Sequence, residues 1–232
     1  MKITVINGIN HKGSTWHAAE ELIKNIADPK EVTEFFLPKD LNHFCNGCYA
    51  CIKAKENCPY WDEKAVIDKA LEEADLLIFT TPTYCMMPSG SMKAFMDLFF
   101  KKWMSHTPSE TMFSKRAVVI STAAGAGAKK AVKPIKTMLQ YWGVPWICTY
   151  GMAVAASNWE EMPERNKVKI LWDMKRIGQG ISAAKGKPHV GIKIRFIFRL
   201  MSGMTKKGYG AGPEEKAYWE ERGWLDGKKP WK

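Results

Sequence analysis

Residues 75–81 read DLLIFTT, and this stretch decides the fold class. Its apolar side chains follow one another without polar ones between them, which is typical of a strand covered on both faces. Residues 117–122, AVVIST, repeat the pattern. Strands of this kind occur mainly in parallel sheets with helices on each side. We therefore expect a parallel sheet at the centre of the chain.

Strands and helices alternate on both sides of these two stretches. Further strands are expected over residues 2–7, 32–37 and 144–150. Apolar side chains spaced three and four apart predict helices over residues 15–27, 62–74, 90–103, 129–141 and 159–184. The alternation predicts an α/β fold with a doubly wound five-stranded parallel sheet. Such sheets bind ligands at the carboxyl ends of their strands, so the loops after the first, third and fourth strands are the candidate site.

Local signals predict finer detail at a few positions. Ser14 is expected to cap the first helix, and Asp28 and Pro29 to end it. Val66 is expected to face the core from the second predicted helix. Residues 82–88 are expected to form a loop.

Composition sets broad limits on function. The chain has 232 residues, a net charge of +11, 46% hydrophobic residues and six cysteines, which excludes general disorder. No apolar run approaches the roughly 20 residues of a membrane span, and no secretory signal is visible. We therefore expect a cytoplasmic protein with reduced, metal-bound or catalytic cysteines. Residues 185–232 carry +7 of the net charge, but without a nucleic-acid-binding motif we expect no nucleic-acid partner.

Residues 8–15, GINHKGST, join the first strand to the first helix. Backbone N–H groups at a helix N-terminus bind anions, and hydroxyls and Lys12 would add to such a site. A tight turn would account for the same residues. The order of residues matches neither a P-loop nor a complete dinucleotide fingerprint.

Residues 82–91, PTYCMMPSGS, follow the third strand, and residues 121–127, STAAGAG, end the fourth. A strand that ends in Pro-x-Tyr before a helix that starts with small residues can hold a flat aromatic ligand. Small residues after the fourth strand let a ligand edge approach the backbone. Core packing accounts for Phe95, Phe99 and Phe100. For Cys85 we favour a packing role over a catalytic one.

Together the three loops resemble those of the flavodoxin-like NAD(P)H-dependent FMN reductases, over about residues 1–185. The resemblance rests on KGST at 12–15, PTY at 82–84, KAFMD at 93–97 and the small-residue loop after the fourth strand. It implies an FMN phosphate on the first loop, the isoalloxazine ring between the other two, and NAD(P)H as a possible electron donor. The phosphate contacts would be Asn10, Lys12, Gly13, Ser14 and Thr15. The ring contacts would be Pro82, Thr83, Tyr84, Cys85, Met86, Thr122, Ala123, Ala124 and Gly125.

Four of the six cysteines lie in an irregular insert at residues 38–61: Cys45, Cys48, Cys51 and Cys58. A C-x2-C-x2-C run with a later Cys-Pro is ferredoxin-like, whereas structural zinc usually takes two separated pairs. Free thiols and zinc remain alternatives. Among relatives of the FMN reductases, the spacing is similar to that of iron–sulfur flavoproteins, which implies a [4Fe–4S] cluster on these four cysteines.

The expected function is an FMN-dependent oxidoreductase that moves electrons through FMN and a [4Fe–4S] cluster. No catalytic acid–base residue is expected, because hydride transfer to flavin needs none. Two alternatives stay open: a cluster-free NAD(P)H:flavin or quinone reductase, and an electron carrier that takes electrons from ferredoxin. Residues 186–232 form a basic, Trp-rich extension. We expect it to pack in a homodimer or homotetramer rather than on a membrane surface.

Overall fold

The computed structural model describes residues 1–27, 30–209 and 212–232. Five parallel strands follow the order β2-β1-β3-β5-β6, which is the flavodoxin-like order. Their bounds are Lys2–Asn7 (β1), Glu31–Phe36 (β2), Leu76–Tyr84 (β3), Arg116–Ala123 (β5) and Trp146–Ala153 (β6). A two-residue strand, β4 (Met87–Pro88), pairs antiparallel with β3. The predicted doubly wound five-stranded parallel sheet is confirmed.

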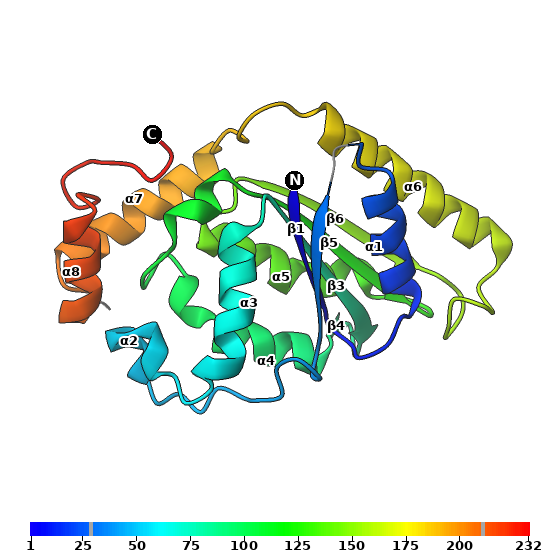
Figure 1. Cartoon of the computed structure of the whole chain (residues 1–232), viewed down its shortest axis with the longest axis horizontal. Coiled ribbons are helices and arrows are strands. Elements are labelled where there is room, and N and C mark those ends of the chain that lie inside the picture. The colour runs from blue at the N-terminus through cyan, green and yellow to red at the C-terminus, as the bar shows by residue number, and fades with distance from the viewer. Residues whose placement is uncertain (28–29, 210–211) are drawn as a thin grey trace.

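Helices cover both faces of the sheet (Figure 1). One face packs on α1 (Ser14–Lys24) and α6 (Glu164–Ala183), and the other on α3 (Trp61–Glu73), α4 (Gly90–Leu98) and α5 (Ala128–Trp142). Within β3, Leu76 and Ile78 enter the first core, whereas Leu77 and Phe79 enter the second. Since successive side chains of a strand point to opposite faces, two cores require the uninterrupted apolar run of residues 75–81.

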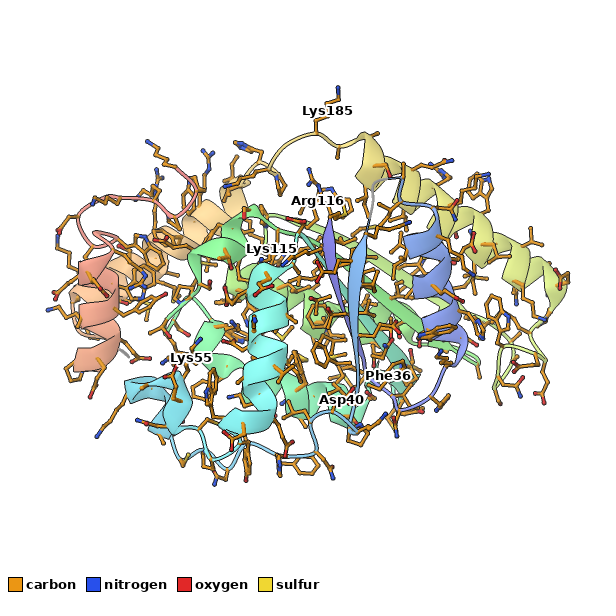
Figure 2. All side chains as sticks on the ribbon, viewed as in Figure 1. Phe36, Asp40, Lys55, Lys115, Arg116 and Lys185 are labelled. Atoms are coloured by element: carbon orange, nitrogen blue, oxygen red, sulfur yellow. The ribbon has the colours of Figure 1, made fainter. Side chains whose placement is uncertain are left out.

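The strand ends define the edge where ligands bind. Figure 2 shows Phe36 and Asp40 at the carboxyl end of β2 and Arg116, the first residue of β5, at the opposite edge. From β1 the chain crosses to β2 on one side, and β3 and β5 follow on the other. The topological switch point, where successive connections run in opposite directions along the sheet, therefore lies between the carboxyl ends of β1 and β3.

Three local predictions were wrong. Helix α1 starts at Ser14 itself, with Gly13 as its N-cap and no side-chain cap. Val66 is 63% exposed, because α3 packs on the sheet through Ile67 and Leu71 instead. Helix α4 ends at Leu98, and a separate 3-10 turn, η2 (Phe100–Lys102), follows. Asp28 and Pro29 lie outside the described residues.

The extension packs on its own chain around a third hydrophobic cluster. Helices α7 (Ile192–Lys206) and α8 (Pro213–Glu221) contribute Phe198 and Trp219 to it, and Phe113 from η3 (Glu110–Ser114) joins them. The indole N–H of Trp219 donates to the carbonyl of His106 at 2.7 Å. Helix α8 lies beside α2 (Ala50–Lys53), which η1 (Lys55–Asn57) follows (Figure 1). Within the described ranges, no helix combines the length and apolar character that crossing a membrane requires.

Candidate functional site

A buried serine holds the switch point together. The hydroxyl of Ser89 donates to the carbonyl of Gly8 at 2.5 Å and accepts from the N–H of Met92 at 3.2 Å, capping α4. The N–H of Gly8 donates to the carbonyl of Thr80 at 2.7 Å. A Cβ on residue 8 would lie 2.9 Å from both the Ser89 hydroxyl and the Thr80 carbonyl, so only glycine fits there. Loop 8–15 and β3 are thus fixed side by side.

The N-terminus of α1 opens onto this loop. Gly13 supplies no side-chain cap, and the first turn carries no acidic residue. Lys12 lies over the Trp16 ring, 4.4 Å from its centroid. The buried indole N–H of Trp16 has no hydrogen-bond partner among the described residues. Uncapped N–H groups at the positive end of a helix, beside a lysine, suit an anion such as a phosphate.

Strand β3 does not stop where the sequence pattern suggests. It continues to Tyr84, turns at Cys85 and Met86, and returns as β4. Both turn residues have positive φ, 51° and 65°, as a two-residue type I′ hairpin requires. The predicted loop at residues 82–88 is therefore wrong. Cys85 is exposed at the tip of the hairpin, so the packing role expected for it is wrong as well.

The hairpin touches the loop after β5. Gly127 has φ +98°, and a Cβ there would lie 2.5 Å from the sulfur of Met86. Within the neighbouring strands β3 and β5, the hydroxyls of Thr83 and Ser121 form a hydrogen bond at 2.9 Å. The backbones on the two sides of the edge are therefore held at a fixed separation.

A cavity of about 460 Å³, here named the edge pocket, lies between these loops. It collects ten of the fourteen predicted contacts: Lys12, Gly13, Ser14, Thr15, Pro82, Thr83, Tyr84, Thr122, Ala123 and Ala124. Asn10, Cys85, Met86 and Gly125 do not line it. The pocket has a further wall that sequence reasoning missed, made of Val154, Ala156, Ser157, Asn158, Trp159 and Glu160.

That missed wall follows β6, the last strand of the sheet. Ligands bind at the carboxyl ends of parallel strands, and this rule applies to β6 as well. The position of the loop directly after β6 was therefore the signal that could have placed it in the pocket. Trp159 stacks on His17 with ring centroids 4.7 Å apart. Burial lowers the pKa of His17, which favours the neutral imidazole at pH 7. The loop after β6 is thereby fastened to α1 through an uncharged ring pair.

The four clustered cysteines line one small cavity next to α2. Gly47 and Tyr49, at φ 70° and 55°, bend the backbone between them. Burial raises the pKa of the Cys51 thiol, and the nearby Lys64 ammonium opposes that rise. The same ammonium lies 3.4 Å from the sulfur of Cys58. Over the described ranges, no three His, Cys, Asp or Glu side chains converge as metal ligands. The thiols therefore share a cavity without the arrangement of a closed metal site.

A family model described as NADPH-dependent FMN reductase matches residues 1–159. The chain belongs to this family. The matched range contains the four clustered cysteines and all but the last residue of the edge pocket, and it stops before α6 and the extension. Membership makes the protein an FMN-dependent oxidoreductase.

Similar proteins agree with this assignment. An iron–sulfur flavoprotein of Clostridioides difficile is 27% identical over 202 residues, which cover 85% of this chain and 87% of that protein. One from Methanocaldococcus jannaschii is 35% identical over 100 residues, covering 42% of this chain and 51% of the relative. An FMN-dependent NADH-azoreductase of Bacillus anthracis, solved with FMN, superimposes with a TM-score of 0.58 at 11% identity, covering 78% of this chain and all of that chain. At that identity the likeness concerns the fold alone.

Proposed function

We propose that this protein moves electrons from NAD(P)H or a reduced ferredoxin, through FMN in the edge pocket, to an acceptor by way of a [4Fe–4S] cluster on the clustered cysteines. The observation that carries the proposal is the meeting of an uncapped helix N-terminus with the loops after β3 and β5 around one cavity. FMN supplies the chemistry when bound, because it accepts hydride and releases electrons singly.

The phosphate end would lie on loop 8–15. The N–H groups at the start of α1 and the hydroxyls of Ser14 and Thr15 are donors, and Lys12 adds positive charge. Asn10 would complete the set from outside the described lining. These groups act by binding and orientation and move no proton.

The ring end would lie between the hairpin and the loop after β5. Pro82, Thr83 and Tyr84 would contact one side, with Cys85 and Met86 beyond them at the tip. Thr122, Ala123, Ala124 and Gly125 would border the ring on its other side. Backbone N–H groups near Ala123 would stabilise negative charge on the reduced ring.

The proposed cluster would be bound by the cysteine segment, residues 45–58. Cys45, Cys48, Cys51 and Cys58 line a single cavity and would supply the four thiolates that a [4Fe–4S] cluster requires. The Lys64 ammonium beside Cys58 would offset part of their negative charge. The relatives named iron–sulfur flavoproteins support this reading.

A cluster-free flavin or quinone reductase is the second candidate. It is favoured by the lack of converging metal ligands in the described part of the chain. We further propose that the protein is a homodimer or homotetramer, which the exposed apolar side chains of α7, among them Ile192 and Phe196, support. We also propose that it is cytoplasmic.

The test is an absorption spectrum with iron and sulfide assays after anaerobic purification. We expect flavin bands on a broad iron–sulfur absorption, with iron and sulfide matching one cluster per chain. Flavin bands alone would exclude the cluster and leave the second candidate. A colourless protein that binds no added FMN would refute the flavin assignment itself.

The ligand set is tested by Cys48→Ser, with Cys148→Ser as the matched control. Cys148 lies in β6, outside the cysteine segment. We expect the first variant to lose iron and keep flavin, and the control to keep both. Full iron content in the Cys48 variant would show that the ligands are assigned wrongly.

A further inference from the structure

A second cavity, of about 400 Å³, lies away from the edge pocket and shares no residue with it. We name it the basic pocket. Its walls come from the η1–α3 region, from η2 and the segment after it, and from α8 of the extension. It adjoins the small cavity of the four clustered cysteines, because Cys51, Lys64 and Leu98 line both cavities.

The wall from the extension is firmly held. The Tyr218 hydroxyl donates to the carbonyl of Pro108 at 2.7 Å, and the Trp219 indole N–H donates to that of His106 at 2.7 Å. Glu215, buried on α8, contacts the His106 ring at 2.5 Å. The cavity is therefore bounded by a fixed helix rather than by a loose tail.

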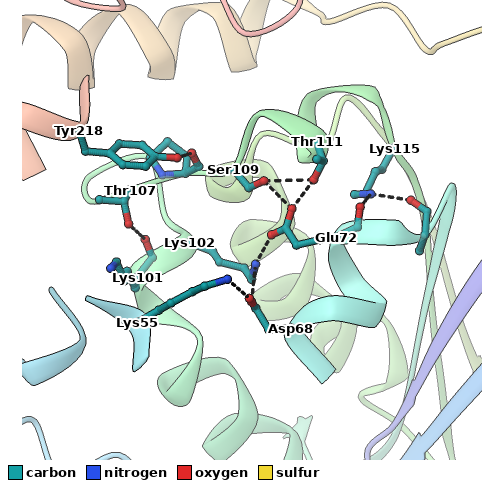
Figure 3. A network of polar contacts seen from close by, with 12 residues as sticks. Lys55, Asp68, Glu72, Lys101, Lys102, Thr107, Ser109, Thr111, Lys115 and Tyr218 are labelled. Carbon is teal, nitrogen blue, oxygen red and sulfur yellow. Dashed lines mark hydrogen bonds and ion pairs between the residues drawn. The ribbon is translucent and has the colours of Figure 1, made fainter. Parts of the chain in front are cut away.

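The carboxylates of the pocket are already satisfied (Figure 3). One oxygen of Asp68 accepts from Lys102 at 2.7 Å and the other from Lys55 at 3.0 Å. One oxygen of Glu72 pairs with Lys102, and the other accepts from Ser109 and Thr111, each at 2.5 Å. Every carboxylate oxygen in the lining therefore already has a partner.

Positive charge nevertheless exceeds negative charge in the lining. Five basic side chains, Lys55, Lys64, Lys101, Lys102 and Arg222, face two acidic ones, which gives a formal net charge of +3. Lys64 is only 5% exposed and already has the sulfur of Cys58 as its partner at 3.4 Å, whereas Lys101, which is partly buried, forms no ion pair with a carboxylate among the described residues. Holding the Lys101 ammonium partly out of water without an anion is costly, and the lining has a net positive charge, so it favours an anionic occupant.

The shape of the occupant follows from the aromatic walls. Each of three rings carries a cation over its face: Lys55 over Trp61 at 5.1 Å, Lys64 over Phe99 at 5.2 Å and Arg222 over Tyr218 at 3.6 Å. Together these rings and the Arg222 guanidinium plane give the lining flat surfaces, which suit a flat ligand.

We propose that the basic pocket binds a small organic dianion: a flat, unsaturated body that carries two carboxylates. Lys101 from η2 and Arg222 at the end of α8 bind the two carboxylates, and the aromatic side chains of the lining contact the body. This binding goes beyond the proposed electron transfer and depends on neither FMN nor a cluster. It places the ligand beside Cys51 rather than in the edge pocket.

The experiment is isothermal titration calorimetry of the full chain, saturated with FMN, using benzene-1,3-dicarboxylate as the probe. Its neutral analogue, benzene-1,3-dicarboxamide, has the same shape and no charge. We expect the dianion to bind with a Kd below about 1 mM and the diamide to bind at least tenfold more weakly, since charge-assisted hydrogen bonds are lost.

Two variants locate the binding. Lys101→Met and Arg222→Gln lie on different walls, and each should weaken dianion binding about tenfold. Lys130→Met, an exposed lysine of α5 outside the pocket, should leave it unchanged. The proposal holds if the dianion outbinds the diamide and at least one of the two pocket variants weakens it. No heat at millimolar probe, equal diamide binding, or wild-type affinity in both variants overturns it.

Discussion

Replacing Ser89 with alanine tests the interactions that hold the switch point together. Ser89 is 3% exposed, and its hydroxyl connects loop 8–15, Thr81 of β3 and the start of α4. Alanine fits the same space, so no cavity larger than the hydroxyl is created. The effect of the change is therefore that of hydrogen bonds lost in a buried setting.

The magnitude follows from two losses. The α4 cap on the N–H of Met92 disappears, which costs about 1 kcal/mol. The Gly8 carbonyl loses its buried donor, which costs about 1–3 kcal/mol. We expect the free energy of unfolding to fall by about 2–4 kcal/mol, or about 1 M in the urea midpoint. FMN affinity should also fall, because loop 8–15 loses its anchor.

Urea unfolding followed by tryptophan fluorescence measures the first effect, and flavin fluorescence quenching measures the second. The matched control is Ser91→Ala, on the same helix, whose hydroxyl makes no hydrogen bond to the described residues. The control should lose less than about 0.5 kcal/mol. If Ser89→Ala loses no more than the control, the hydroxyl does not hold the switch point and the reasoning fails.

Three further outcomes are expected, each measured by urea unfolding. Gly127→Ala should lower the free energy of unfolding by about 1–3 kcal/mol, because φ at this residue is +98° and a Cβ would clash with Met86. Gly125→Ala, where a Cβ would meet open space, should lower it little. Equal losses in the two variants would count against the contact between residue 127 and Met86. Although burial acts to raise the pKa of Asp68, Lys102 and Lys55 hold it below its ordinary value. Its contribution to stability is therefore present above about pH 4 and lost as pH falls through the folded pKa, and Asp68→Asn should flatten this acid dependence. Trp219→Ala should lower the free energy of unfolding by about 3–5 kcal/mol, because it removes a fully buried ring. A loss under about 1 kcal/mol would mean that the extension unfolds separately from the rest of the chain.

The sheet and its helices were predictable because their signals are local. An apolar run such as residues 75–81 is needed wherever a strand lies between two cores, whatever the rest of the chain does. Loop 8–15 and the loop after β5 could be located for a related reason. Parallel strands bring their carboxyl ends to one edge, so strand order along the chain places these loops together.

Two features were missed because no residue type along the chain marks them. The turn at Cys85 and Met86 lacks the glycine or asparagine that usually marks a type I′ hairpin, and it exists because β4 pairs back on β3. Val66 was assigned to the core on spacing alone, whereas the rotation of α3 is set by how Ile67 and Leu71 meet the sheet.

By itself, the sequence determined the α/β class, three of the loops around the edge pocket and the grouping of four cysteines. These follow from residue types at short spacing. The tertiary structure alone decided that Asp68 and Glu72 neutralise Lys102 and that Lys101 has no carboxylate partner in the part of the chain that the structure describes. It alone placed α8 against the cysteine segment, across more than 150 residues of chain. Charge balance in a buried site depends on which side chains meet, and spacing along the chain does not specify such meetings.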